Sequence, residues 1–191
     1  MMKTLPQFKI IDLNYLDEDL HHQAAHLLLL GFAHDWPNAW PTLETALDEV
    51  KETLGEEKIC RLAVTESGEV IGWIGGFPQY DGQTWELHPI VVHPEYQGVG
   101  IGTALVLDFE DQVRKRGATT IFLGTDDESE MTSLGGIDLY PDVLEHLSSL
   151  KSRRSHPFEF YQKLGYSVVG VIPDANGPGK PDIIIAKRVE S

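Results

Sequence analysis

The sequence predicts a mixed α/β sandwich with a partly antiparallel sheet, and three observations support this class. Strand-like apolar runs alternate with segments of helical spacing, three of the runs follow one another with only turns between them, and a glycine-rich turn joins a strand to a helix. With 191 residues, of which 41% are hydrophobic and 24% charged, the chain can bury a proper core. We therefore expect a single domain over residues 1–191.

The first half of the chain is expected to form one strand, two helices and then three strands. Residues 8–14 alternate as a strand does, and Asp17 can cap a helix that runs to about Leu30. A second helix fits residues 41–54, where apolar residues recur at helical spacing and Gly55 ends it. The three successive strands are expected over 58–65, 70–77 and 85–92.

The second half is expected to add three helices and three strands. A helix from about Gly100 to Arg116 is stopped by Gly117, and residues 119–124 form a short buried strand. Residues 125–140 are polar without a clear period, which indicates a functional or interface loop. The last elements are expected as helices over 141–151 and 157–164 and strands over 166–172 and 182–189.

The charge balance narrows the class of ligand. Thirty acidic and fifteen basic residues leave a formal charge of -15, which disfavours nucleic acid and anionic membranes as partners and favours a cationic one. An acidic surface that only keeps the protein soluble is the simpler alternative.

Location and redox chemistry are also constrained. The longest apolar run, residues 24–32, is too short to span a membrane, and the N-terminus lacks the pattern of a secretory signal, so we expect a cytoplasmic protein. The single cysteine, Cys60, cannot form an internal disulfide or a cysteine-based zinc cluster, and we expect no metal site. Its strand-like surroundings favour a buried structural residue over a nucleophile.

The glycine-rich turn that follows the strand at 85–92 is suited to holding a phosphate. Gly98, Gly100 and Gly102 let the main chain bend and approach a ligand, and the next helix offers unpaired N–H groups. A dinucleotide fold is disfavoured because the spacing is Gly-x-Gly-x-Gly and the strand is the fourth one. The chain contains no Gly-Lys-Ser or Gly-Lys-Thr, so a Walker loop is unsupported, and a plain chain reversal is the remaining alternative.

Read from Gln97, the turn is Gln-x-x-Gly-x-Gly, which resembles the acyl-coenzyme A loop of the GCN5-related N-acetyltransferases (GNAT). Longer strings over about residues 60–188 resemble the chromosomal, dimeric aminoglycoside 6'-N-acetyltransferases. These strings are residues 85–92, 123–127, 138–140, 156–166, 169–177 and 180–187. The resemblance before Cys60 is weaker, as is expected for a segment that shapes an acceptor pocket.

The resemblance implies a GNAT-type fold, with a mostly antiparallel central sheet that is flanked by helices and splayed at strands 4 and 5. It also implies acetyl-CoA as the acyl donor and a homodimer. Ile90 N–H would polarise the acetyl carbonyl, and Val92 would pair with the pantetheine arm. The full set of implied cofactor-binding residues is Ile90, Val91, Val92, Gln97, Gly98, Val99, Gly100, Ile101, Gly102, Thr103 and Ser152.

Pro89 and Ser152 depart from the ordinary patterns. Pro89 interrupts a strand that should be central, where its missing N–H breaks the ladder, and a plain β-bulge is the alternative to a functional break. Ser152 stands where many superfamily members carry an asparagine. The neighbouring Lys151, Arg153 and Arg154 could meet the 3'-phosphate of coenzyme A or simply offset a helix dipole.

Three residues are candidates for proton transfer, because acetyl transfer requires a neutral amine and benefits from a protonated leaving group. Glu86 is the first candidate for the base, and His88 lies on the same strand face and could relay through water. Tyr161 occupies the tyrosine position that the family uses to protonate the departing thiolate. Glu86 and His88 could each instead be only a binding or structural group, and Tyr161 could be a core aromatic.

The acceptor site is expected to be acidic and aromatic. Asp126 and Asp127 end the fifth strand and could bind ammonium groups, although one of them could instead cap a helix. The other candidates for substrate binding, besides Glu86, are Asp35, Trp36, Trp40 and Asp182.

We expect an acetyl-CoA-dependent enzyme that acetylates the 6'-amine of aminoglycosides by direct transfer in a ternary complex, since Cys60 is poorly placed as an acyl carrier. The acceptor is thus a cationic small-molecule amine. Two alternatives stay open: an N-acetyltransferase for a polyamine or peptide amine, and a non-catalytic CoA-binding module.

Overall fold

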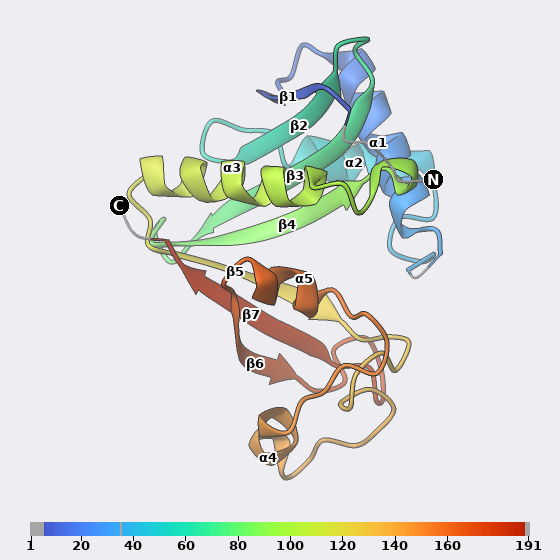
Figure 1. Cartoon of the computed structure of the whole chain (residues 1–191), viewed down its shortest axis with the longest axis vertical. Helices are drawn as coiled ribbons and strands as arrows, with labels where there is room; N and C mark the ends of the chain where they lie inside the picture. Colours follow the sequence, from blue (N-terminus) through green and yellow to red (C-terminus); the bar gives the residue numbers. More distant parts are fainter. Residues whose placement is uncertain (1–5, 35, 190–191) are drawn as a thin grey trace. The chain divides into compact units, whose positions relative to one another are not determined.

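A computed structural model describes residues 6–34 and 36–189, which form two compact units (Figure 1). The first unit runs to Thr119 and includes Val189, and the second is Thr120–Arg188. Each is described by itself, and the single domain expected over residues 1–191 stays a prediction. No helix in the described part of the chain is long and apolar enough to cross a membrane.

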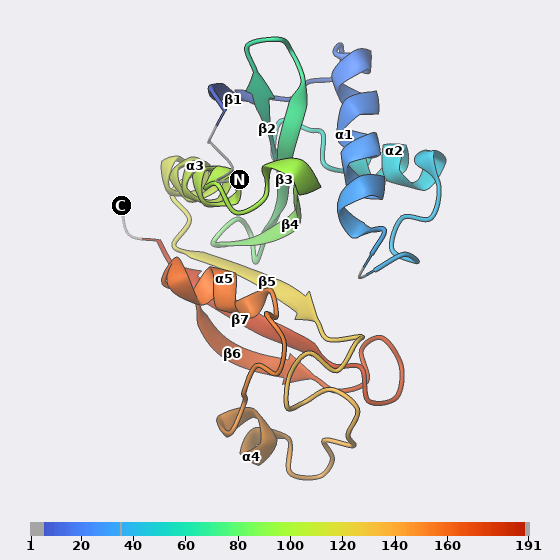
Figure 2. The ribbon, with the colours of Figure 1, turned by 45° about the vertical axis from the view of Figure 1, so that its right-hand side comes forward.

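The first unit contains a four-stranded antiparallel sheet in the order β1-β2-β3-β4. Its helices α1 and α2 lie on one face, and α3 lies on the other (Figures 1 and 2). The elements are β1 Phe8–Asp12, α1 Glu18–Phe32, α2 Leu43–Glu52, β2 Ile59–Thr65, β3 Val70–Gln79, β4 Thr84–Val92, the 3-10 turn η1 Pro94–Tyr96 and α3 Ile101–Lys115.

The two helices on the first face begin in different ways. Thr42 and Thr45 form a capping box at the start of α2, in which each side chain bonds the other residue's main-chain N–H. The expected helix start at Asp17 is confirmed, but the Asp17 side chain makes no capping bond. Glu18 and Asp19 in the first turn of α1 instead place negative charge near the positive, N-terminal end of the helix dipole.

Small residues let the helices lie close to the sheet. A Cβ atom on Gly31 of α1 would overlap the side chain of Val91 on β4. On the opposite face, a Cβ on Gly72 of β3 would lie 2.8 Å from Leu105 of α3, and one on Gly76 would overlap the ring of Phe109. The glycines of β3 thus make room for the apolar face of α3.

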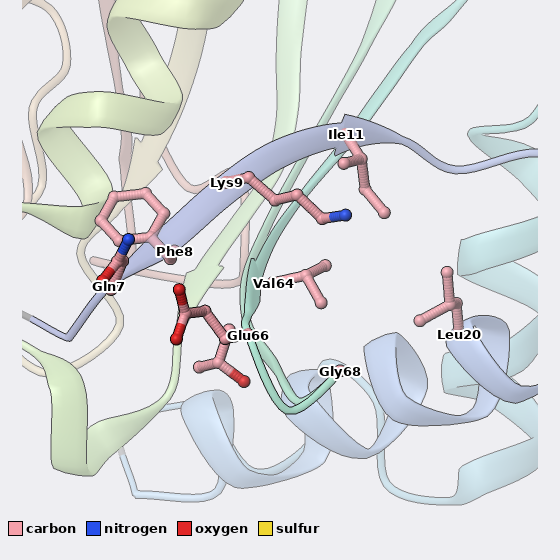
Figure 3. A pocket seen from close by; sticks show the side chains of 9 residues that line it. Gln7, Phe8, Lys9, Ile11, Leu20, Val64, Glu66 and Gly68 are labelled. Carbon is pink, nitrogen blue, oxygen red and sulfur yellow. The ribbon is translucent and has the colours of Figure 1, made fainter.

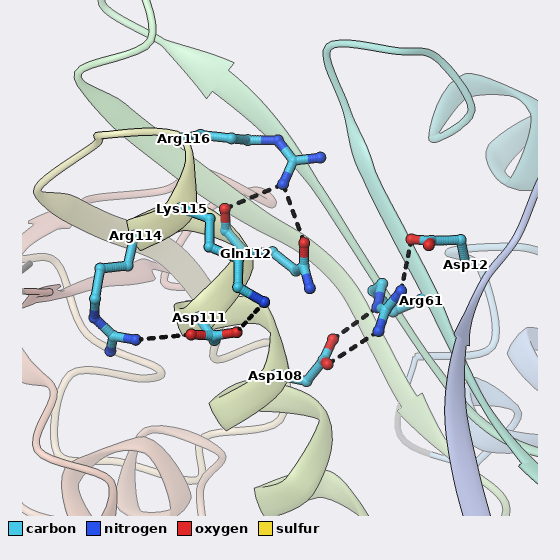
Figure 4. Close-up of polar contacts among 8 residues, drawn as sticks. All are labelled: Asp12, Arg61, Asp108, Asp111, Gln112, Arg114, Lys115 and Arg116. Carbon is cyan, nitrogen blue, oxygen red and sulfur yellow. Dashed lines mark hydrogen bonds and ion pairs between the residues drawn. The ribbon is translucent and has the colours of Figure 1, made fainter.

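Arg61 of β2 ties this face of the sheet to α3 (Figure 4). Its guanidinium donates two hydrogen bonds to the Asp108 carboxylate, at 2.7 and 3.0 Å, and lies 2.6 Å from Asp12. The Arg61 and Asp108 side chains are only 11% and 20% exposed, whereas Asp12 is 80% exposed. The bidentate pair with Asp108 is therefore the better shielded of the two contacts.

The second unit is a three-stranded antiparallel sheet in the order β5-β7-β6. Helices α4 and α5 each contact β6. The elements are β5 Thr120–Asp126, α4 Val143–Ser148, α5 Phe158–Lys163, β6 Ser167–Ile172 and β7 Asp182–Arg188. The mixed α/β class with mostly antiparallel pairing is confirmed, and the splay between strands 4 and 5 stays a prediction.

Helix α4 is shorter than the expected 141–151 because the residues that follow it form hydrogen bonds to another loop instead of continuing the helix. Ser148 and Ser149 donate side-chain bonds to carbonyls one turn earlier. Lys151 N–H then bonds the Ser133 hydroxyl, and Ser152 pairs with Thr132 as an isolated bridge. These bonds replace the next turn of the helix.

We predict that Asp108→Asn lowers the free energy of unfolding by about 2 kcal/mol, because it weakens a shielded charge-assisted pair. The matched control is Asp111→Asn on the same helix, where the carboxylate pairs with Arg114 and Lys115 at the surface. This control should change the free energy little, since exposed pairs contribute little. Urea unfolding of both variants measures the difference, and equal losses would contradict the prediction.

Candidate functional site

The glycine-rich loop leaves β4 through η1 and is fastened to the end of that strand. The Gln97 amide donates a hydrogen bond of 3.1 Å to the carbonyl of Val92. Gly98 and Gly100 then have φ of +81° and +101°, which non-glycine residues rarely adopt. The turn that follows leads directly into Ile101, the first residue of α3.

The start of α3 fits a phosphate group. No side chain caps this helix, so its first-turn N–H groups are available to an anion. A Cβ at either Gly98 or Gly100 would meet no atom within 4 Å, so open space adjoins the loop main chain. Uncapped amides beside open space are what the main-chain cradle expected over residues 97–103 requires.

The strand break expected at Pro89 is confirmed as a register shift between β3 and β4. Ile74 pairs with Ile90 and Gly76 with Leu87, so Gly75 alone faces both His88 and Pro89. A Cβ on Gly75 would lie 2.7 Å from the His88 carbonyl oxygen and 2.9 Å from the Thr53 side chain. The bulge therefore requires glycine at this position, a requirement that the Gly75-Gly76 pair within an apolar strand could have indicated.

Glu86 lies on β4 just before the bulge, and His88 lies in the bulge itself. The Glu86 carboxylate is partly buried and accepts a hydrogen bond of 3.1 Å from the Gln79 amide. The His88 side chain is half exposed, and its Nε2 lies 3.5 Å from the Glu49 carboxylate. Both side chains are thus held by neighbours of the same unit.

Glu49, on α2, was not among the residues selected from the sequence. It accepts a hydrogen bond of 3.1 Å from the indole N–H of Trp40 and also contacts His88. Nothing in the sequence distinguishes it from the other acidic residues of α2, because only the fold brings β4 and Trp40 to it.

The aromatic residues expected at the acceptor site lie together between α1 and α2. Trp40 packs edge-on against Phe32, with ring centroids 4.7 Å apart, and Trp36 lies 5.8 Å from the same ring. The Trp40 ring is 6.0 Å from that of His88. Asp35, the remaining candidate here, lies outside the described residues.

In the second unit, Tyr161 is buried on α5 and packs against the rings of Phe160 and Tyr166. Burial raises the pKa of the Tyr161 phenol, so the hydroxyl stays protonated at neutral pH. Tyr161 therefore packs as a core aromatic, which is the simpler interpretation. Its hydroxyl also keeps the proton that a donor to the thiolate would need.

Asp126 and Asp182 face each other in register on β5 and β7. The Asp126 carboxylate accepts a hydrogen bond of 2.5 Å from the Asn176 amide, and the Asp182 carboxylate fills the space that a Cβ on Gly124 would take. Two carboxylates opposite each other repel, and a cation between them would relieve that repulsion. This end of the sheet is suited to an ammonium group.

The carboxylate of Asp127 organises a loop. It is fully buried and accepts hydrogen bonds from the N–H groups of Met131 and Thr132 and from the Thr132 hydroxyl, at 2.6 to 2.8 Å. Gly135 packs so closely that a Cβ there would lie 2.7 Å from the same carboxylate. Because these bonds occupy its acceptors, we leave Asp127 out of the proposed acceptor site.

Two basic residues, Arg153 and Arg154, fasten the same loop. The Arg153 side chain donates to the carbonyl of Gly135, and the Arg154 side chain donates to that of Ser129. Both main-chain N–H groups bond the Met131 carbonyl. These loop contacts are neither of the two roles considered for the basic stretch, which were binding of the coenzyme A 3'-phosphate and compensation of a helix dipole. Cofactor binding by Ser152 stays a prediction.

His156 joins the end of β5 to the start of α5. Its Nε2 donates to the Asp126 carbonyl at 3.2 Å, and its Nδ1 accepts the Phe158 N–H at 3.3 Å, which requires the neutral ring. Burial lowers the pKa of this imidazole, although the Asp127 carboxylate opposes the shift. The neutral ring thus helps to hold the helix that carries Tyr161.

The state of the single cysteine and the question of a metal site also bear on the chemistry. The Cys60 thiol is buried between the Thr53 hydroxyl and the Trp73 indole, and burial raises its pKa, as expected for a structural cysteine. Within residues 6–34 and 36–189, no group of three or more His, Cys, Asp or Glu side chains could hold a metal ion.

A pocket of about 620 Å³ lies between β1, the β2–β3 turn and α1 (Figure 3). Its lining is Gln7, Phe8, Lys9, Ile11, Leu20, Val64, Thr65, Glu66 and Gly68. It shares no residue with β4 or with the glycine loop, and it forms no part of the candidate site.

Residues 22–140 match the model of the acetyltransferase (GNAT) family. The chain belongs to this family. A curated acetyltransferase of Photorhabdus laumondii is 37% identical over 65 residues, which are 34% of this chain and 44% of that protein, so the match spans less than half of the relative.

Two solved structures are similar over nearly the whole chain. An aminoglycoside 6'-N-acetyltransferase in complex with coenzyme A is 40% identical, with a TM-score of 0.87. The aminoglycoside 6'-N-acetyltransferase from Enterococcus faecium is 39% identical, with a TM-score of 0.84. Both alignments cover 96% of this chain and 98% of the other.

We predict that Gly100→Ala raises the KM for acetyl-CoA of this GNAT protein about tenfold, because the new methyl group occupies the space expected for the cofactor. Gly117→Ala is the matched control: this glycine, just after α3, also has positive φ (+77°) and open space around its Cβ. Both variants should lose about 1 kcal/mol of stability from backbone strain. Initial rates and urea unfolding check this, and equal KM values in the two variants would refute it.

A second prediction concerns pH. The folded-state pKa of His156 is lowered, so its contribution to stability is complete above the ordinary pKa of about 6.5 and is lost as the pH falls below it. His156→Gln removes this titration, so wild type should lose up to about 1.4 kcal/mol per pH unit more than the variant. Urea unfolding at several pH values between 7.5 and 5 measures both slopes, and parallel slopes would contradict the assignment.

Proposed function

We propose that this protein is an acetyl-CoA-dependent N-acetyltransferase that acetylates the 6'-amine of aminoglycosides by direct transfer in a ternary complex. The observation that carries the proposal is the 40% identity, over 96% of the chain, to an aminoglycoside 6'-N-acetyltransferase. The acidic and aromatic side chains near β4 and at the ends of β5 and β7 support a cationic acceptor.

Acetyl-CoA supplies an activated acetyl thioester when it is bound. The chain's part is to hold it: the uncapped amides of residues 97–103 bind the pyrophosphate, and the main chain of Ile90 to Val92, just after the bulge, binds the pantetheine arm and the acetyl carbonyl. A main-chain N–H at Ile90 would stabilise negative charge on that carbonyl oxygen. Because Gly75 fixes the bulge, it also fixes where this strand segment begins.

The acceptor enters as an ammonium ion and must lose a proton before its nitrogen can form the new C–N bond. Glu86 is the proposed base, with His88 as a water-mediated relay. When the C–S bond breaks, Tyr161, which burial keeps protonated, would give its proton to the departing thiolate. The second proton on the nitrogen would then pass to the Tyr161 oxygen, directly or through water, which restores the hydroxyl and leaves a neutral amide. Direct transfer is favoured because the only thiol, Cys60, is buried and its pKa is raised.

Acceptor recognition rests on charge and aromatic surface. Asp126 and Asp182, which face each other in the second unit, are the carboxylates proposed to bind an ammonium group. Trp36 and Trp40 offer apolar faces against which sugar rings pack. A formal charge of -15 raises the local concentration of a polycationic drug around the whole chain. The homodimer that the family resemblance implies and the cytoplasmic location expected from the N-terminal pattern stay proposals.

We predict that the protein acetylates an aminoglycoside with a 6'-amine and does not acetylate a matched aminoglycoside with a 6'-hydroxyl. Mass spectrometry identifies the modified position, and initial-rate patterns should intersect, as a ternary complex requires. Preferential turnover of spermidine or of a peptide amine would overturn the acceptor assignment, and parallel rate lines would overturn direct transfer.

Glu86→Gln distinguishes an enzyme from a CoA-binding module without activity. The variant keeps an oxygen that can accept the hydrogen bond from Gln79, but it cannot act as a base. It should lower kcat about 100-fold or more while coenzyme A still binds. If wild type binds coenzyme A and acetylates none of the amines, the protein is a non-catalytic module.

A further inference from the structure

Glu49 joins two side chains that are separate in the sequence. The Trp40 indole donates its hydrogen bond to one carboxylate oxygen, at 3.1 Å, and His88 Nε2 lies 3.5 Å from the other. Trp40 belongs to the loop between α1 and α2, and His88 lies at the bulge of β4. The carboxylate therefore holds one side chain from each of two different elements.

The carboxylate is well shielded. The Glu49 side chain is 16% exposed, whereas that of Asp48, the preceding residue on α2, is 63% exposed and pairs with Lys51. Helix α2 is fixed by its capping box and by the buried residues Ala46 and Val50. A charge removed from water requires polar partners. Trp40 and His88 are the partners that this position provides.

We propose that Glu49 is a positioning residue for acceptor acetylation: it holds the Trp40 ring against the acceptor and sets the orientation and tautomer of His88. At 3.5 Å from the carboxylate, Nε2 is the ring nitrogen that would donate to Glu49 in the neutral ring, which would leave Nδ1 to accept a proton. This inference rests on the proposed function, because it assigns Glu49 a task in the same acceptor site.

The kinetic test compares three variants. Glu49→Ala removes both contacts and should lower kcat/KM for the aminoglycoside about tenfold or more, with the KM for acetyl-CoA unchanged. Glu49→Gln keeps an acceptor for the indole N–H and should fall between Glu49→Ala and wild type. Asp48→Ala, the matched control on the exposed side of α2, should behave as wild type.

A mutant cycle separates positioning from direct binding. If Glu49 acts only through its two partners, adding Glu49→Ala to a variant that already carries His88→Ala and Trp40→Phe should change kcat and the acceptor KM by less than about twofold. If Glu49 binds the acceptor ammonium itself, the added substitution raises the acceptor KM by as much as it does in wild type, and the positioning role is overturned.

A nuclear magnetic resonance experiment tests the contact without any turnover. The chain has four tryptophans, so its indole N–H groups give few signals, and Trp40→Phe identifies the one from Trp40. Glu49→Ala should shift this signal and Asp48→Ala should not. An unmoved signal would overturn the proposal.

The kinetic results separate failure of the proposed function from failure of the role of Glu49. If wild type acetylates no aminoglycoside, the proposed function fails. If wild type is active and Glu49→Ala is equally active, only the role of Glu49 is refuted.

Discussion

The bulge in β4 is the constraint on which the first unit's part of the site depends. Two residues, His88 and Pro89, occupy the length of strand that faces Gly75 alone, and the His88 carbonyl fills the space where a Cβ would be. Behind Gly75 lies Thr53, whose hydroxyl contacts the Cys60 thiol. The end of α2, β2, β3 and β4 therefore meet at one point, and a larger residue at position 75 would displace them together.

Acidic side chains serve two different purposes in this protein. Asp108 and Asp127 are shielded and bind groups of the protein itself, one a guanidinium and the other three donors of a loop. Glu86, on β4, and Asp126 and Asp182, paired at the ends of β5 and β7, are partly buried and are the carboxylates proposed to act on the acceptor. The net charge of the chain therefore combines structural carboxylates with those proposed to bind the acceptor.

Much of the fold could be predicted from local pattern. The three-strand meander, the glycine turn and the helix after it were predicted because turn residues, apolar periodicity and glycine conformation act within a few residues. Helix α4 was predicted too long because its end is set by the Ser133 hydroxyl and a bridge to Thr132, which are distant in sequence. The 3-10 turn before the loop was not predicted, since His93 stabilises it through one side-chain bond.

The sequence by itself determined the family resemblance, the glycine loop and the residue types of the acceptor site, because these are properties of consecutive residues. Only the tertiary structure decided which acidic residues are engaged within the protein. Asp126 and Asp127 are adjacent, yet the second is closed inside a loop by Thr132 and Gly135. Glu49 and Asp48 are adjacent too, and only Glu49 meets Trp40 and His88. Burial and partners depend on segments brought from elsewhere in the chain, which no local pattern contains.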